Sequence, residues 1–158
     1  MKRTVRWVGV GLALLLLLAR APVTQAVDTS IAIAAILADH EAHGMADDAL
    51  SQSVVTIAHV ATETYSVLTR LPPPLRVDGA TAAAIIGARL PSSCLTLDAD
   101  AHASAPGRLA GADVIGGATY DGLIALTALA HDLELLSRDR RAARTYRALG
   151  IHFRLLGA

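Results

Sequence analysis

The sequence has a single cysteine and no excess charge of either sign, and each shortage excludes a class of structure. Cys94 cannot form an internal disulfide. Its place beside Leu95 and Leu97 predicts a buried, reduced thiol, which favours a reducing compartment. Lys and Arg together number 14, as do Asp and Glu, so the chain offers no broad basic field to nucleic acid. Any contact with RNA or DNA must therefore come from a local patch.

The chain also lacks internal repeats and linker-like stretches. Its 158 residues are 53% hydrophobic, which is enough for one core, so we expect a single domain over residues 23–158. Residues 1–22 differ from the rest. A basic start, MKRTVR, precedes an apolar run over residues 7–19 and a short polar stretch, which is the layout of a secretory signal peptide. The run is shorter than the roughly 20 apolar residues of a membrane span.

Short apolar runs alternate with helical patterns over the rest of the chain. We predict strands at residues 23–28, 54–58, 94–97, 133–137 and 151–156, and helices at residues 30–38, 59–70, 79–90, 119–130 and 140–149. Residues 40–48 are polar and turn-like, and an Ala-rich stretch before Gly116 is weakly patterned. Strands separated by helices pair in parallel, so the predicted fold class is α/β, a three-layer α/β/α sandwich with a central parallel sheet.

Four acidic residues occupy the same kind of place in this pattern. Asp28 ends the first predicted strand, and Asp139 closely follows the fourth. Asp121 is in the first turn of its helix, and Glu63 is about one turn into the helix after the second strand. The working site of an open parallel sheet lies beyond the carboxyl ends of its strands, so all four can reach one edge.

Carboxylates without His or Cys partners suit a hard cation such as Mg²⁺ or Mn²⁺ better than zinc. Such an ion lowers the pKa of a bound water and neutralises charge on a phosphodiester, so hydrolysis of that bond is the natural reaction. Each acid also has a structural interpretation: Asp28 and Asp139 can cap helices, Asp121 suits a helix dipole, and Glu63 can be solvated. Spacing alone does not decide between the two interpretations.

Three stretches resemble the successive motifs of PIN-domain proteins, specifically VapC-type toxins. They are VDTSIAIAAILADHEAH, IAHVATETYSVLTRLPPPLR and GGATYDGLIALTALAHDLELLSRDRRAARTYRALGI, and the similarity extends from residue 23 to the C-terminus. The resemblance implies a metal-dependent endoribonuclease, with Mg²⁺ or Mn²⁺, that acts on structured RNA such as tRNA or rRNA. It also implies a cognate antitoxin protein and a homodimer, for which Ala82, Ile85 and Ile86 are candidate interface residues.

The resemblance assigns the four acids to the catalytic and metal-binding positions of that family. Asp28 lies in VDTS, Glu63 in TETYS, Asp121 in TYDGL and Asp139 in SRDRR. It also assigns supporting hydrogen bonds to two hydroxyl residues, Ser30 and Ser137.

The leader departs from the family pattern, because such proteins begin close to the first strand. Cleavage after Ala26 would remove that strand and leave Asp28 at a free end. We favour a true start near Val23 and a cytoplasmic protein, since VTQAVDTS resembles an ordinary toxin start. The alternative is an exported or membrane-tethered module with this fold, a retained leader and no catalysis.

Two further groups of residues have both a functional and a structural interpretation. Arginines flank Asp139, and Arg138, Arg140 and Arg144 are candidates for RNA binding, although a solvated helix face explains them equally well. His40, Glu41 and His43 do not match the His-Glu-x-x-His spacing of zinc enzymes, so we expect surface residues there.

Overall fold

The computed structural model describes residues 24–53 and 55–157, so the leader lies outside the described residues. It contains five short strands, β1 (Gln25–Val27), β2 (Thr56–Ile57), β3 (Cys94–Leu95), β4 (Glu134–Ser137) and β5 (Phe153–Leu155). All pairings are parallel. The strands form a three-stranded sheet in the order β1-β4-β5 and a two-stranded sheet of β2 and β3, and β2 also contacts β1.

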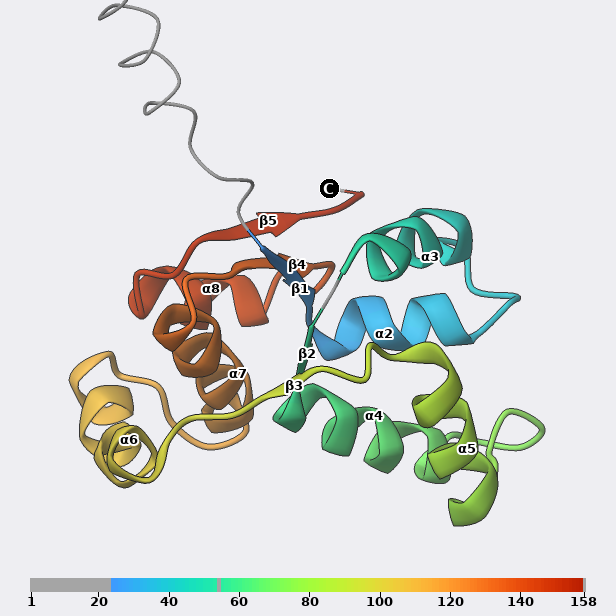
Figure 1. The fold of residues 1–158 in the computed structure, drawn as a ribbon, viewed down its shortest axis with the longest axis horizontal. Coiled ribbons are helices and arrows are strands. Elements are labelled where there is room, and N and C mark those ends of the chain that lie inside the picture. The colour runs from blue at the N-terminus through green and yellow to red at the C-terminus, as the bar shows by residue number, and fades with distance from the viewer. Residues whose placement is uncertain (1–23, 54, 158) are drawn as a thin grey trace, which may run out of the picture.

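Helices connect the strands and cover them on both sides. Their bounds are α2 (Thr29–Ile36), α3 (His43–Gln52), α4 (Ala58–Arg70), α5 (Gly79–Arg89), α6 (Ala99–Gly111), α7 (Ala118–Ala130) and α8 (Ala142–Ala148). Figure 1 shows α2 and α3 on one side of β1 and β4, with α7 and α8 on the other. The predicted three-layer α/β/α fold with parallel strands is confirmed. Over the part of the chain described, no helix has the length and apolar character needed to cross a membrane.

Two helices were not predicted. In α3, a stripe of Ala46, Ala49 and Leu50 is buried at helical spacing, and the polar residues between these positions hide it in the sequence. In α6, the Asp98 side chain accepts a hydrogen bond from the Ala101 amide at 2.7 Å and caps the helix. This helix contains Pro106, which normally opposes a helix interior, so its sequence pattern is weak.

The expectation for Cys94 is wrong. The residue is exposed, and its thiol is free. β3 has one strand partner, β2, and its first residue faces outward, so the apolar sequence around the cysteine does not produce a buried thiol.

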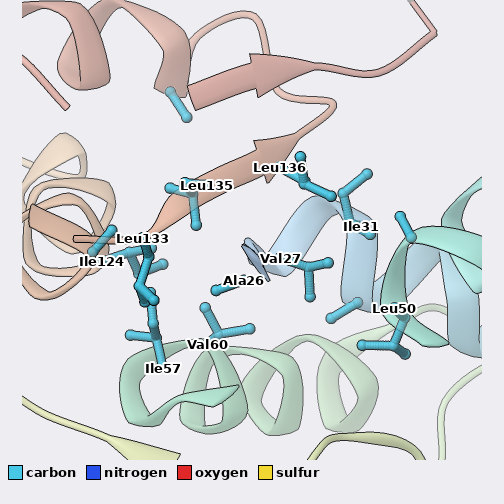
Figure 2. Close-up of a cluster of buried hydrophobic side chains, with 14 of the residues drawn as sticks. Ala26, Val27, Ile31, Leu50, Ile57, Val60, Ile124, Leu133, Leu135 and Leu136 are labelled. Atoms are coloured by element: carbon cyan, nitrogen blue, oxygen red, sulfur yellow. The ribbon is translucent and has the colours of Figure 1, made fainter. Parts of the chain in front are cut away.

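The core lies where β1 and β4 meet the helices. Consecutive residues of each strand are buried, Ala26 and Val27 in β1 and Leu135 and Leu136 in β4, because helices cover both faces. Figure 2 shows Leu136 beside Ile31 of α2, while Leu135 points to a different part of the core. Leu135→Ala would cost about 2–5 kcal/mol of unfolding free energy.

The register of these two strands places the site. Val27 is paired with Leu136, so β1 and β4 end at the same edge. The Asp28 amide donates a hydrogen bond of 2.9 Å to the Leu136 carbonyl, which extends the ladder by one residue. Asp28 therefore leaves the sheet next to Ser137, the last residue of β4.

Candidate active site

The four predicted acids line one pocket at this edge. The pocket has a volume of about 320 Å³, and we name it the carboxylate pocket. Its lining residues are Asp28, Thr29, Ser30, Ile33, His40, Glu63, Val67, Asp121, Ile124 and Asp139. Side chains from the N-cap and body of α2, from α4, from α7 and from the segments after α2 and β4 thus meet in a single place, although they are spread over more than a hundred residues of sequence.

Asp28 is held rigidly at the base of the pocket. It caps α2, and its Oδ1 accepts hydrogen bonds from the Ser30 amide at 3.0 Å, the Ser30 hydroxyl at 2.6 Å and the Ile31 amide at 3.2 Å. Its Oδ2 accepts a bond of 3.1 Å from the buried Tyr146 hydroxyl. Burial raises the pKa of Asp28, while hydrogen bonds from Ser137, Ser30, the Ile31 amide and Tyr146 oppose that rise.

Glu63 enters the pocket from α4 and is oriented by α2. The Thr29 hydroxyl donates a hydrogen bond of 2.6 Å to Glu63 Oε2. The bond fixes one carboxylate oxygen and leaves the other for a ligand.

Asp121 is the electrostatic centre of the pocket. Burial, followed in importance by the charges of Glu63, Asp139 and Asp28, raises its pKa to about 6. Among the described residues, no hydrogen bond is donated to its carboxylate, in contrast to Asp28. An unpaired acid repelled by three others is the arrangement that a divalent cation relieves.

Asp139 caps α8. Its Oδ1 accepts hydrogen bonds from the Arg141 amide at 2.6 Å and the Ala142 amide at 3.3 Å. The Ser137 hydroxyl in turn accepts a bond of 2.9 Å from the Asp139 amide, and the Ser30 hydroxyl accepts one of 2.8 Å from the Arg138 amide. The two predicted hydroxyl residues thus tie the chain after β4 to the start of α2.

The arginines around Asp139 do not form one group. Arg138 is mostly buried, with 19% of its side chain exposed, and pairs with Glu41 at 3.2 Å. Arg140 and Arg144 are exposed beside the pocket. Arg147 lies over the ring of Phe153, 5.5 Å from its centroid.

Sequence reasoning missed three residues of the site. Thr29 and Tyr146 hold two of the acids, and His40, expected at the surface, is half-buried and lines the pocket. Tyr146 had a signal in the sequence: with Ala142 and Ala143 it makes an inward helical stripe, and a buried tyrosine hydroxyl needs a partner. Thr29 and His40 had none.

The pocket suits a hard divalent cation in its chemistry, since all four charged groups are carboxylates. Across residues 24–53 and 55–157, however, no three His, Cys, Asp or Glu side chains are grouped closely enough to hold a metal ion. Mg²⁺ commonly binds one or two carboxylates and keeps several waters, so the residues fit a hydrated ion. Direct ligation by all four acids stays a prediction.

Comparison with known proteins agrees with this geometry. A family model described as "PIN domain" matches residues 26–148. Ribonuclease VapC40 of Mycobacterium tuberculosis is 45% identical over 129 residues, which cover 82% of this chain and 96% of that protein. Ribonuclease VapC27 of the same species is 40% identical over 128 residues, 80% of this chain and 93% of that protein.

A solved structure shares the fold. It is that of Mycobacterium tuberculosis VapC20, described as a sarcin-ricin loop cleaving toxin, with a TM-score of 0.56 and 22% identity over 75% of this chain and 92% of that one. The family match covers most of the chain. The chain therefore belongs to the PIN-domain family, as its resemblance to VapC-type proteins predicts.

Proposed function

We propose that this chain is a metal-dependent endoribonuclease, the toxin of a toxin–antitoxin pair, and that it hydrolyses phosphodiester bonds in structured RNA such as tRNA or rRNA. The observation that carries the proposal is the carboxylate pocket: four acids from four separate segments converge on one volume of about 320 Å³. The ribonuclease class predicted from the sequence is confirmed by relatives at 45% and 40% identity that are ribonucleases.

The pocket needs a cation before it can accept this substrate. Four carboxylates repel a phosphodiester, so RNA cannot enter the pocket unaided. When bound, Mg²⁺ or Mn²⁺ supplies charge neutralisation and a water of lowered pKa. Asp121, Glu63, Asp28 and Asp139 would hold it.

The residues of the chain fix the geometry around that ion. Thr29 holds Glu63, Tyr146 and Ser30 hold Asp28, and the start of α8 holds Asp139. Asp121 has no such holder among the described residues, and burial and its acidic neighbours raise its pKa to about 6. A carboxylate of this kind is suited to take a proton from an attacking water at physiological pH.

RNA cleavage by the purified protein tests the proposal. We expect cleavage of tRNA or rRNA with Mn²⁺ or Mg²⁺ and none in excess EDTA. Asp121→Asn should lower the rate by at least about a thousandfold, as for other residues that act as a unit. Asp48→Asn, an exposed change on α3, is the matched control and should cleave normally. Cleavage by Asp121→Asn at the control rate would contradict the mechanism.

Contacts to the substrate would come from the arginines near Asp139. We assign this role to Arg140 and Arg144, which are exposed, and to Arg138, whose guanidinium already pairs with Glu41. Replacing each with Ala should weaken RNA binding, and the effect should be smallest for Arg138.

Partners and location form the remaining part of the proposal. A cognate antitoxin and a homodimer are expected, with Ile85 and Ile86 of α5 half-buried and available for an interface. Ala82 is fully buried within this chain, so its assignment to the interface is wrong. Light scattering with and without the product of the neighbouring gene measures both associations. A monomer at micromolar concentration would contradict the homodimer.

A cytoplasmic protein with its start near Val23 is the companion proposal. The N-terminal mass of protein made from the native gene tests it, because a product that begins at Met1 or Val27 would favour export. The alternative of a non-catalytic exported module has no support from the relatives, which are ribonucleases, or from the pocket, which has all four acids.

A further inference from the structure

A second depression lies beside the carboxylate pocket and is larger. Its volume is about 710 Å³, and we name it the arginine depression. It lies between the α6–α7 connection and the start of α8, and its lining residues are Ala112, Asp113, Val114, Ile115, Ala118, Arg140, Arg141, Arg144, Thr145 and Ala148.

One wall of the depression is cationic. Residues 141, 144, 145 and 148 follow helical spacing, so they form one stripe along α8. Within the described part of the chain, the ion pairs involve Arg89, Arg138 and Arg154, and none of them uses Arg140, Arg141 or Arg144. Three unpaired guanidinium groups thus face a single carboxylate, that of Asp113, which makes this wall a local positive patch on a chain with no net charge.

The opposite wall is apolar. Ile115 is 73% exposed, and Val114 and Ala118 continue the surface. Gly122 of α7 supports this wall, because a Cβ there would lie 2.3 Å from Leu109 Cδ2 and 3.4 Å from Val114 Cγ1. Its absence lets α6 and the following loop pack closely against α7, which sets the position of Val114 and Ile115.

Neighbouring residues line the two hollows. Arg140 follows Asp139 of the carboxylate pocket, and Ala118 lies one helical turn before Asp121 on α7. An RNA strand with a phosphate at the four acids therefore has the arginine depression within reach of its adjacent nucleotides. An RNA strand is complementary to both walls of the depression: its phosphates bind guanidinium groups, and an unpaired base packs on an apolar surface.

We propose that the arginine depression is a nucleotide subsite for the RNA strand next to the scissile bond, which rests on the proposed ribonuclease function. Arg141 and Arg144 each contact one phosphate, and Ile115 packs against an unpaired base. This subsite differs from the set predicted from the sequence, Arg138, Arg140 and Arg144: Arg141 joins it, while Arg138 lies elsewhere. Such a subsite favours unpaired nucleotides beside the cut over a continuous duplex.

Binding measured in EDTA tests the arginine depression by itself, because without a cation the carboxylate pocket repels RNA, and the test does not depend on cleavage. The full chain is titrated into a short, labelled, unstructured RNA by fluorescence anisotropy at several salt concentrations. The double variant Arg141→Ala/Arg144→Ala should bind more weakly, and its log affinity against log salt should be shallower by about 1.4, at about 0.7 per lost phosphate contact with a single strand. Arg76→Ala/Arg154→Ala removes the same charge away from the depression and should keep the wild-type slope.

The apolar wall has a separate test. Ile115→Ala should weaken binding to the RNA and leave its salt slope unchanged, while binding to an abasic strand of the same length stays at the wild-type value.

If the Arg141→Ala/Arg144→Ala variant equals its control in affinity and slope, the proposed subsite is wrong, even where cleavage with Mn²⁺ is intact. Unchanged RNA binding together with lost binding of a polyglutamate peptide would also overturn it and assign the depression to an acidic protein. Failure of the wild type to cleave any RNA with Mn²⁺ would instead contradict the proposed function.

Discussion

Asp28 and Asp121 face the same pocket from two differently built regions. Asp28 ends β1, caps α2 and accepts four hydrogen bonds, one of them from Tyr146 of α8. Asp121 lies in the first turn of α7, and no described residue donates a hydrogen bond to its carboxylate. Asp28 therefore stabilises the fold as well as the site. Asp121 is instead buried beside like charges with no described hydrogen-bond donor, a state that a bound cation would relieve.

The largest expected difference between the two concerns stability. Asp28→Ala removes the cap of α2 and leaves the Ser30 and Tyr146 hydroxyls without their acceptor. We expect a loss of about 2–4 kcal/mol in the free energy of unfolding at neutral pH. Asp121→Ala should cost less than about 1 kcal/mol, because it breaks no hydrogen bond. Urea denaturation in EDTA measures both, and equal losses would remove the distinction.

Metal binding should act mainly through Asp121. Mn²⁺ at a hundredfold excess over its Kd should raise the unfolding free energy of the wild type by about 2.7 kcal/mol. In Asp121→Asn this gain should fall by more than half, while Asp48→Asn should keep it. Thermal melts with and without Mn²⁺ show the effect, and equal shifts in the two variants would mean that Asp121 does not bind the ion.

Removal of one donor from Asp28 should have a smaller effect. Tyr146→Phe deletes the hydroxyl that donates to Asp28 Oδ2 and keeps the ring that packs against Phe153. We expect a loss of about 1–1.5 kcal/mol in the free energy of unfolding. A larger loss of cleavage rate than in Phe153→Leu, which alters packing alone, would show that the hydroxyl positions Asp28. Equal effects would make Tyr146 a core residue only.

The smallest effect should appear in the pH dependence of stability. The pKa of Asp121 is about 6 in the folded protein against 3.8 for an ordinary Asp, so the folded state binds the proton more tightly. Its stabilising contribution is present at low pH and is lost as pH rises through about 6. After allowance for solvent screening, Asp121→Asn should be more stable than the wild type by about 1 kcal/mol at pH above this value in EDTA. The difference in unfolding free energy between the variant and the wild type should disappear near pH 4. A difference that stays constant with pH would mean that packing, and not charge, causes it.

The sequence predicts the four acids of the site better than it predicts the residues that orient them. Asp28 and Asp139 follow strands, and Glu63 and Asp121 lie early in helices, so a parallel α/β pattern is enough to bring them to one edge. The residues that orient the acids through hydrogen bonds could not be predicted in this way. Tyr146 lies 118 residues from Asp28, and such a contact depends on how α8 is seated on the sheet, which no local pattern specifies.

The sequence did not predict α3 and α6 for a related reason. α3 buries only Ala46, Ala49 and Leu50, and α6 only Ala105 and Leu109, so their apolar stripes are too narrow to stand out from a loop. These helices form through packing on neighbours rather than through propensity. Cys94 shows the opposite error, because its apolar neighbours predicted burial and the residue is exposed. An apolar sequence at the edge of a two-stranded sheet need not be covered by other elements.

The bond between Tyr146 and Asp28 bears on how the nuclease comes into being during translation. β1 is the first described strand, yet within its sheet it pairs only with β4, so the earliest part of the domain has no strand partner there until residues 134–137 have been made. Pairing over such a separation makes closure of the chain slow. Asp28 reaches its final orientation only after residue 146 has left the ribosome and α8 has docked. An incomplete chain therefore lacks an assembled pocket, and a cell that synthesises this protein meets its activity only when the C-terminal helix is in place.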